Sequence, residues 1–131
     1  MHEFSDSSPP IVVTVLSDGL GDWELLRSHL APLGLQVSGL DVDSLDGSPP
    51  TPQSTGLYVF IMNTNDRKAV AKMNALRQAN AQAGILALLL NGSPEARVIA
   101  LQAGADDCLE YPVDPQLLRA VMASIARRMM W

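Results

Sequence analysis

Few side chains in this chain of 131 residues could do chemistry, and they are scattered. Ser17 and Asp18 follow the apolar run 11–16, but no serine, histidine and aspartate are spaced in a way that shows a catalytic triad. A lone carboxylate makes a poor Mg²⁺ site, because Mg²⁺ prefers carboxylates together with phosphate oxygens. We therefore expect Asp18 to be a polar loop residue or a helix cap, not a metal ligand.

Cys108 is the only cysteine, which excludes an internal disulfide and a metal site built from cysteines. Its neighbours are apolar or acidic and should raise the thiol pKa, so we expect an inert, buried side chain. His2 and His29 have no Asp, Glu or Cys cluster near them at ligand spacing. The glycines after Asp18 lack the third glycine of a GxGxxG loop, which leaves nucleotide binding as a weak alternative. The sequence predicts no metal, no cofactor and no enzymatic activity.

The composition fits one globular domain, with 47% hydrophobic and 18% charged residues. The net charge of −5 disfavours direct contact with nucleic-acid phosphates or anionic lipid. The longest aliphatic run, 85–90, is too short to span a bilayer. Residues 1–10 are polar and resemble a flexible leader more than a signal peptide. We expect a cytoplasmic domain over 11–128, with 129–131 as a tail or the start of a linker.

Strands and helices are expected to alternate along the chain. The β-branched and aliphatic runs predict strands at 11–16, 35–40, 57–62, 85–90 and 107–109. Helical spacing and capping signals predict helices that begin at 22, 93 and 115 and a helix over 67–81, and Gly104 is expected to end the helix that begins at 93. Residues 41–56 are expected to be mainly loop. Uniformly apolar strands between helices favour a parallel sheet covered on both faces. The fold class is therefore α/β, a single flavodoxin-like, doubly wound sheet of five parallel strands with helices on both faces.

The stretch Leu89–Arg128 resembles the C-terminal third of response-regulator receiver domains, the CheY-like domains of two-component signalling. Its most specific pieces are ARVIALQAGADDCL and the following Pro112-Val113-Asp114-Pro115. Over Ile11–Ala83 the resemblance rests on the spacing of strands and helices. It implies a receiver fold over the whole domain.

In working receivers, two acidic residues after the first strand hold Mg²⁺ and an aspartate ending the third strand accepts the phosphoryl group. A Thr or Ser ends the fourth strand, and a lysine precedes a cis proline after the fifth. The resemblance places these functions at Ser17 and Asp18, Ile61, Leu89 and Tyr111. Of these, Asp18 alone has the expected chemistry. We therefore predict an atypical receiver, or pseudo-receiver, that lacks the phosphoacceptor aspartate.

A shift of register would move the acceptor position from Ile61 to Met62 or Asn63, and neither can form an acyl phosphate. Asp66 lies past the turn and is better explained as a helix cap. The resemblance implies a cis bond before Pro112. We expect the ring of Tyr111 to cover Leu89 and Ile61, because apolar filling costs less than an unpaired buried lysine.

The predicted function is phosphorylation-independent protein–protein interaction in signal transduction or transcription regulation. The expected surface is the one that receiver domains form from their helix 4, strand 5 and helix 5. In this chain it corresponds to the predicted helix beginning at 93, the strand 107–109 and the helix beginning at 115, paired with a second copy by a two-fold axis. Its candidate residues are Arg97, Val98, Leu101, Asp106, Asp107, Arg119 and Val121. DNA would be contacted only through an attached output domain, and no membrane contact is expected.

Two alternatives stay open. The first is a small-molecule sensor that binds at the carboxyl ends of the strands, with 43–55 as a lid. The second is a conventional phospho-receiver whose register differs from the one above.

Overall fold

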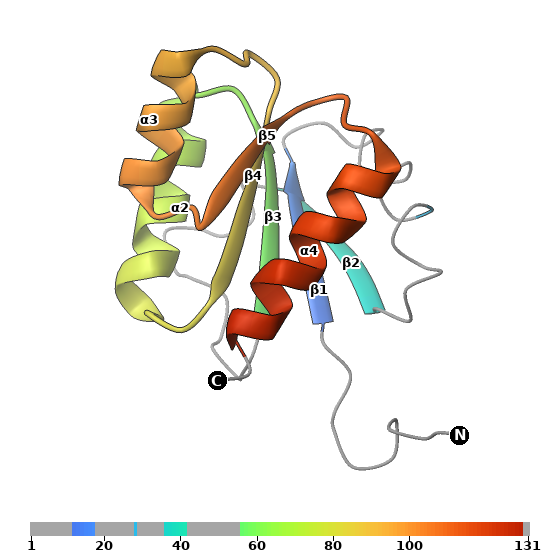
Figure 1. Ribbon diagram of the computed structural model, residues 1–131. Helices are drawn as coiled ribbons and strands as arrows, with labels where there is room; N and C mark the ends of the chain where they lie inside the picture. Colours follow the sequence, from blue (N-terminus) through green and yellow to red (C-terminus); the bar gives the residue numbers. More distant parts are fainter. Residues whose placement is uncertain (1–11, 18–27, 29–35, 42–55, 130–131) are drawn as a thin grey trace, which may run out of the picture.

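The computed structural model describes residues 12–17, 28, 36–41 and 56–129 (Figure 1). The strands are β1 (Val12–Ser17), β2 (Gln36–Asp41), β3 (Gly56–Met62), β4 (Gly84–Leu89) and β5 (Asp107–Glu110). Neighbouring strands pair in parallel, and the five-stranded sheet has the order β2-β1-β3-β4-β5. The helices are α2 (Arg67–Ala79), α3 (Pro94–Ala103) and α4 (Pro115–Met129). The prediction of an α/β fold with a parallel sheet is confirmed.

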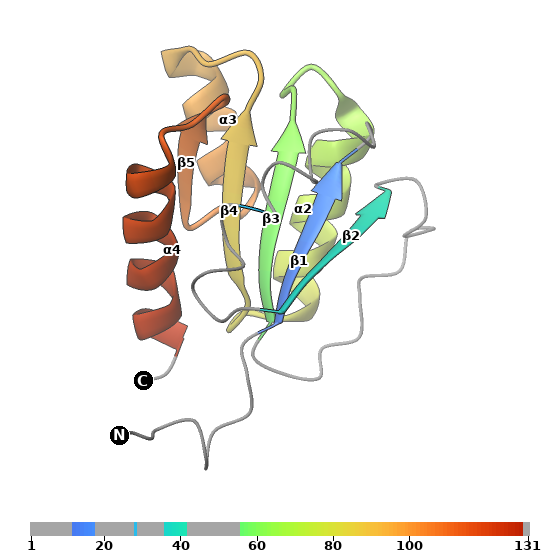
Figure 2. The same cartoon turned by 90° about the vertical axis from the view of Figure 1, so that its right-hand side faces the viewer.

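The described helices cover both faces of the sheet. Figure 2 shows α4 on one side of the strands and α2 and α3 on the other. Two apolar clusters fill the spaces between these layers. One joins alternate strand residues to Met73 and Leu76 of α2 and to Ala100 of α3. The other joins the remaining strand residues to Leu118 and Met122 of α4.

The strands β3 and β4 are almost entirely apolar because each of their faces packs against a helical layer. All six residues of β4 are buried, and in β3 only Gly56 is partly exposed. The strands lie within one residue of the predicted runs, and β5 extends to Glu110. Such strands carry no polar face, so the sequence pattern marks their position but not which side chains point to which layer.

Local side-chain chemistry sets where the helices begin and end. Asp66 caps α2 by accepting hydrogen bonds from the backbone nitrogens of Lys68 and Ala69. Ser93 caps α3 through a 3.1 Å bond from the nitrogen of Ala96. Gly104 follows α3 with a φ of 128°, a conformation that favours glycine. The cap and stop signals in the sequence are confirmed at these three positions, and α2 ends two residues earlier than predicted.

Several sequence-based expectations lie outside the described residues. These are the leader 1–10, Asp18, the helix beginning at 22, residues 42–55 of the expected loop and the last two residues. The ends of that loop were placed wrongly, because Asp41 belongs to β2 and Gly56 to β3. None of the described helices is long and apolar enough to cross a membrane.

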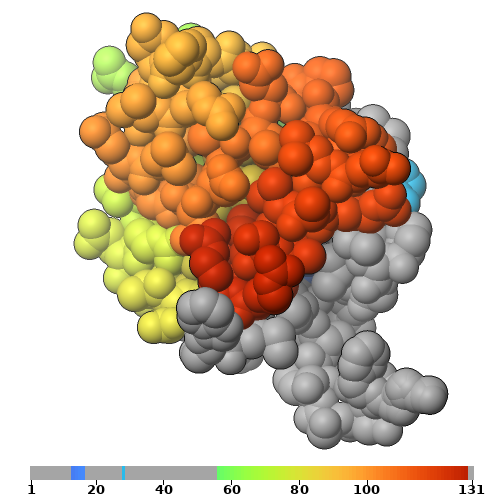
Figure 3. Space-filling model, in the orientation of Figure 1, coloured from blue at the N-terminus to red at the C-terminus, as the bar shows by residue number. Residues whose placement is uncertain are grey.

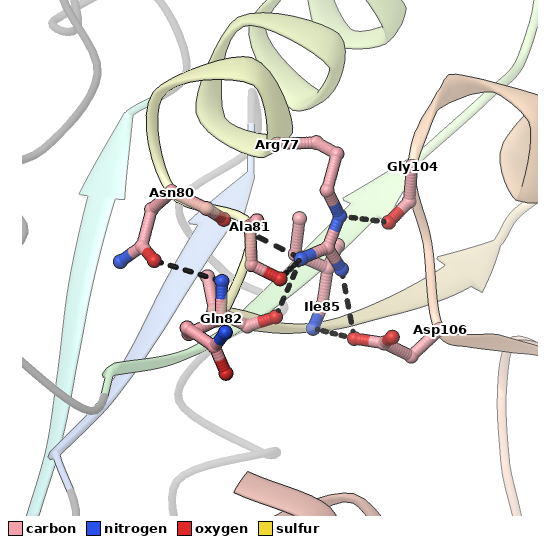
Figure 4. A network of polar contacts seen from close by, with 8 residues as sticks. Arg77, Asn80, Ala81, Gln82, Ile85, Gly104 and Asp106 are labelled. Atoms are coloured by element: carbon pink, nitrogen blue, oxygen red, sulfur yellow. Dashed lines mark hydrogen bonds and ion pairs between the residues drawn. The ribbon is translucent and has the colours of Figure 1, made fainter.

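Arg77, in the last turn of α2, joins the ends of three elements (Figure 4). Its Nε donates to the carbonyl of Gly104 at 3.0 Å, and Nη2 pairs with the carboxylate of Asp106 at 2.9 Å. Nη1 donates to three backbone carbonyls, those of Asn80, Ala81 and Ala83. The same oxygen of Asp106 also accepts from the nitrogen of Ile85, at the start of β4. One guanidinium thus fixes the chain where α2 meets β4 and where α3 meets β5.

Candidate functional site: the carboxyl edge and the α3–β5–α4 face

The carboxyl edge of the sheet is where the resemblance places a phosphorylation site. In the third strand, Ile61 is 1% exposed and Met62 is also buried. Leu89, at the end of β4, is fully buried and pairs with Met62 in the strand register. Ser17 ends β1 and pairs with Ile61, while Asp18 lies outside the described residues. The described acceptor and hydroxyl positions therefore hold buried aliphatic side chains.

These apolar side chains do not form one filled pocket. Ile61 and the partly buried Tyr111 belong to the cluster under α4. Leu89 and Met62 belong to the cluster under α2 and α3, on the opposite face. The expectation that Tyr111 covers Leu89 and Ile61 together is therefore wrong for Leu89. Ile61 and Leu89 instead belong to two separate hydrophobic clusters.

The chain after β5 keeps the backbone geometry that the resemblance implies. The Tyr111–Pro112 peptide bond is cis. The backbone nitrogen of Tyr111 donates to the carbonyl of Leu89 at 2.9 Å, extending the β4–β5 pairing by one residue. The side chain at this position is a phenol instead of an ammonium group, and it packs on the α4 cluster. The cis peptide bond before Pro112 is therefore present, while the positive charge of a lysine at position 111 is absent.

Thr64 and Asn91 tie together the loops that follow β3 and β4. The nitrogen of Thr64 donates to Oδ1 of Asn91 at 3.2 Å, and Nδ2 of Asn91 donates to Oγ1 of Thr64 at 3.0 Å. The nitrogen of Leu90 also donates to the carbonyl of Met62 at 2.9 Å. These contacts join the two loops directly, through neutral groups. Sequence analysis missed this pair because its members are 27 residues apart.

Carboxylates close to this edge in the described chain serve other purposes. Asp66 caps α2, and the exposed Glu110 lies against Gly92, where an added Cβ would meet its side chain. Among the described residues, no three His, Cys, Asp or Glu side chains form a group that could hold a metal ion. Metal-assisted transfer to a carboxylate needs a nucleophile and ligands together. The buried side chains of Ile61, Met62 and Leu89 supply neither.

The α3–β5–α4 face presents large aliphatic side chains to solvent. Figure 3 shows these three elements as one continuous surface. Val98 and Leu101 of α3 are 51% and 47% exposed, and Leu117 of α4 is 47% exposed. The residues that α3 buries are alanines, Ala96 and Ala100 among them. This helix therefore buries small apolar side chains and leaves larger apolar ones exposed, whereas an ordinary amphipathic helix buries its large apolar side chains.

The structure separates the seven interface candidates into two groups. Arg97, Val98 and Leu101 are exposed, and Arg119 is partly exposed. Asp106 is held by Arg77 and Ile85, and Oδ1 of Asp107 accepts from the nitrogen of Cys108 at 2.8 Å. Val121 packs against the α4 cluster. Asp106 and Val121 thus stabilise the fold from within, so the exposed aliphatic residues and the arginines make up the free surface.

Sequence analysis also missed exposed residues close to this face. Leu117 lies in the first turn of α4, and Leu90 follows β4; both are large and exposed. Leu117 stands beside the buried Leu118, so only the helical phase tells the two apart. Leu90 continues the apolar run of β4 by one residue, and the run alone does not show where the strand ends.

Burial in the second half of the sheet affects two titratable groups. Burial raises the pKa of the Cys108 thiol, Arg97 lowers it in part, and Asp107 raises it further. Burial also raises the pKa of Tyr58. Arg97 and Asp107 thus shift the pKa of the Cys108 thiol in opposite directions, and burial leaves the neutral thiol favoured. The expectation of an inert core cysteine agrees with this environment.

We expect stability to fall at alkaline pH, with a smaller fall in Cys108→Ala. Because the folded chain has the raised thiol pKa, it holds that proton more tightly than the unfolded chain. Stability is therefore full below the unfolded pKa and declines as pH rises above about 9. Urea unfolding at pH 7 and pH 10 measures the difference. Equal declines in the parent and in Cys108→Ala would show that the Cys108 thiol is not responsible. Tyr58→Phe measures the contribution of the Tyr58 hydroxyl, whose pKa is also raised.

No family model matches the chain, and no curated protein sequence matches it. Solved structures do. A BeF3-activated DrrB receiver domain has a TM-score of 0.76 at 17% identity, covering 91% of this chain and 99% of that one. A two-component response regulator from Clostridium difficile has a TM-score of 0.76 at 18% identity, covering 91% and 98%. A protein named for pilus assembly (cpaE), from Burkholderia thailandensis E264, has a TM-score of 0.78 at 16% identity, covering 89% and 98%. At these identities the likeness concerns the fold, and the chain has the α/β fold of response-regulator receiver domains.

Proposed function

We propose that this domain is a phosphorylation-independent receiver that acts by binding protein through its α3–β5–α4 face. The observation that carries the proposal is the joint presence of a buried, aliphatic acceptor position and an exposed, aliphatic helix α3. The first removes the usual switch, and the second offers a surface for contact. The proposal concerns binding and includes no catalysed reaction.

Loss of phosphorylation is supported at three described positions. Ile61, Leu89 and Tyr111 stand where the acceptor, the hydroxyl and the lysine are expected, and none can do that chemistry. Moving the acceptor to Met62 does not help, because this side chain is buried in the core under α2 and α3. Asn63 is partly exposed, but its side chain is an amide that accepts from the nitrogen of Asn65. A conventional phospho-receiver with another register gains no support here.

The α3–β5–α4 face has the make-up of a contact surface. Val98, Leu101 and Leu117 supply apolar area, and Arg97 and Arg119 supply charge around it. Aliphatic centres with charged rims are typical of protein interfaces. β5 lies at the edge of the sheet with the exposed Glu110 at its end, so acidic and basic groups both lie on this side. A second copy of the chain, related by a two-fold axis, would place opposite charges across the contact.

The expected consequence is control of an output domain or partner protein in the cytoplasm, in signal transduction or transcription regulation. DNA would be contacted through that output domain. A small-molecule sensor whose ligand lies over Ile61 and Leu89 has less support, since both side chains are buried. Neither of them lines the pocket beside the end of α4 or the groove between α2 and α3. A role in pilus assembly is a second candidate output, favoured by the likeness to the cpaE structure.

Self-association is tested by sedimentation equilibrium from low to high micromolar concentration. We expect a monomer–dimer equilibrium, and Leu101→Asp should raise its dissociation constant at least about tenfold by placing a carboxylate in the apolar centre. Arg119→Glu should weaken the dimer as well. Gln78→Glu, which adds the same charge to an exposed position of α2, is the matched control and should change little.

A monomer at high micromolar concentration, unchanged by Leu101→Asp and Arg119→Glu, would contradict self-association through this face. A dimer that both variants leave intact would place the contact elsewhere. Circular dichroism of each variant confirms that the fold survives, which is expected because Leu101 is exposed.

A further inference from the structure

A groove of about 400 Å³ runs between α2 and α3. Val70 of α2 and Ile99 and Ala103 of α3 supply its apolar lining. It exists because α3 turns alanines toward the sheet and carries Ile99 on its rim, 39% exposed. Its size falls within the range of small-molecule sites. Neither Val98 nor Leu101 lines it, so it is separate from the α3–β5–α4 face.

The polar groups of the groove gather where α2 begins. Thr64 and Arg67 both line the groove, and Arg67 is exposed. Of the described residues that line it, Arg67 alone carries a charge, in a chain whose net charge is −5. A guanidinium binds a carboxylate with two parallel donors. Charge complementarity therefore favours a ligand that is anionic at this end and apolar beyond it.

Thr64 is a second, independent indication of a ligand. It is the one buried polar side chain among the described residues, with 8% of its surface exposed. Its oxygen accepts from Asn91, and its hydroxyl hydrogen is donated to no described residue. Because Thr64 lines the groove, this hydroxyl hydrogen is available to a ligand there. An anionic oxygen beside Arg67 would supply the missing acceptor.

We propose that this groove binds a small aliphatic carboxylate, with the carboxylate on Arg67 and Thr64 and a branched alkyl group against Val70, Ile99 and Ala103. The ligand is a free small molecule. Gln102, on the rim, supplies an amide that can bond to the second carboxylate oxygen or to a polar substituent. The proposal is independent of self-association, because it uses another side of α3.

The test is a titration of the full chain, labelled for methyl and amide NMR, with isocaproate. We expect saturable shifts at Val70, Ile99 and Ala103 with a dissociation constant on the order of millimolar, as suits a ligand of this size. Isocaproamide, with the same alkyl group and no charge, should bind at least about tenfold more weakly. Acetate, which lacks the alkyl group, should give no saturable shift at these methyls.

Variants assign the binding to the groove. Arg67→Gln should raise the dissociation constant about tenfold or more, since it removes the cation from an exposed position. Thr64→Val should weaken binding, and Thr64→Ser, which keeps the hydroxyl, should retain it. Arg97→Gln, on the outer side of α3, is the matched control and should bind as the parent does. Equal binding of isocaproamide, unchanged binding by Arg67→Gln, or no saturable shift would each overturn the proposal.

Discussion

Replacing Ile61 by aspartate is expected to lower the free energy of unfolding by about 4 kcal/mol at pH 7, and not to create a phosphorylation site. Ile61 is almost fully buried within the cluster that includes Leu118 and Tyr111. A carboxylate there loses its hydration, and none of the residues in this cluster carries a positive charge to pair with it. The variant restores the residue type of a phosphoacceptor in surroundings that are apolar. Urea unfolding monitored by circular dichroism measures the loss.

The pH dependence of this variant separates charge from shape. Burial should raise the pKa of the introduced carboxyl, so the folded state holds the proton more tightly than the unfolded state. The destabilisation should therefore be smallest below about pH 4 and should grow as pH rises. Asn63→Asp is the matched control, because Asn63 is partly exposed and an aspartate can still accept from the nitrogen of Asn65. A loss below about 1 kcal/mol at pH 7 for Ile61→Asp would show an open, polar site instead.

Replacing Arg77 by methionine is expected to lower the free energy of unfolding by about 2–3 kcal/mol. The change keeps an unbranched side chain of similar helix propensity, shorter than arginine, but removes an ion pair and four bonds to backbone carbonyls. Breaking a buried ion pair typically costs about 3–5 kcal/mol. The side chains of Arg77 and Asp106 are 23% and 29% exposed, so solvent screening reduces that figure.

The matched control is Lys72→Met, which removes a cation from the same helix that forms no ion pair with the described residues. It should change the free energy of unfolding by less than about 0.5 kcal/mol. Asp106→Asn should be destabilising too, and the double variant with Arg77→Met should cost less than the sum, because the two side chains share one interaction. Strictly additive losses would mean that the pair contributes nothing beyond its separate contacts.

The sequence predicts the strands and helix ends because each depends on neighbours along the chain. Five apolar runs give five strands, and Asp66, Ser93 and Gly104 act where their residue types indicate. Each of these signals is local: a run of branched side chains, a capping oxygen, or a glycine that accepts a positive φ. The α/β class follows from their order.

The composition of the site was harder to predict than its position. Ile61 and Leu89 both end strands, yet they belong to opposite layers. In a strand buried on both faces, no polar residue marks which side chains point to which layer. The sequence pattern therefore could not show that Ile61 and Leu89 point to opposite layers. Arg77 and Asp106 are 29 residues apart, and only the folded chain brings them together. Interface candidates chosen by position therefore included Asp106, whose charge is used inside the domain.

An attempted phosphorylation tests most directly whether this domain can accept a phosphoryl group. The full chain is incubated with acetyl phosphate and Mg²⁺, and separately with beryllofluoride and Mg²⁺, beside a receiver domain known to accept phosphate. Intact mass and amide chemical shifts are then measured. We expect an unmodified mass, unchanged shifts and an unchanged sedimentation profile. A phosphoryl group found on any aspartate, or shifts at the carboxyl edge with beryllofluoride, would contradict it.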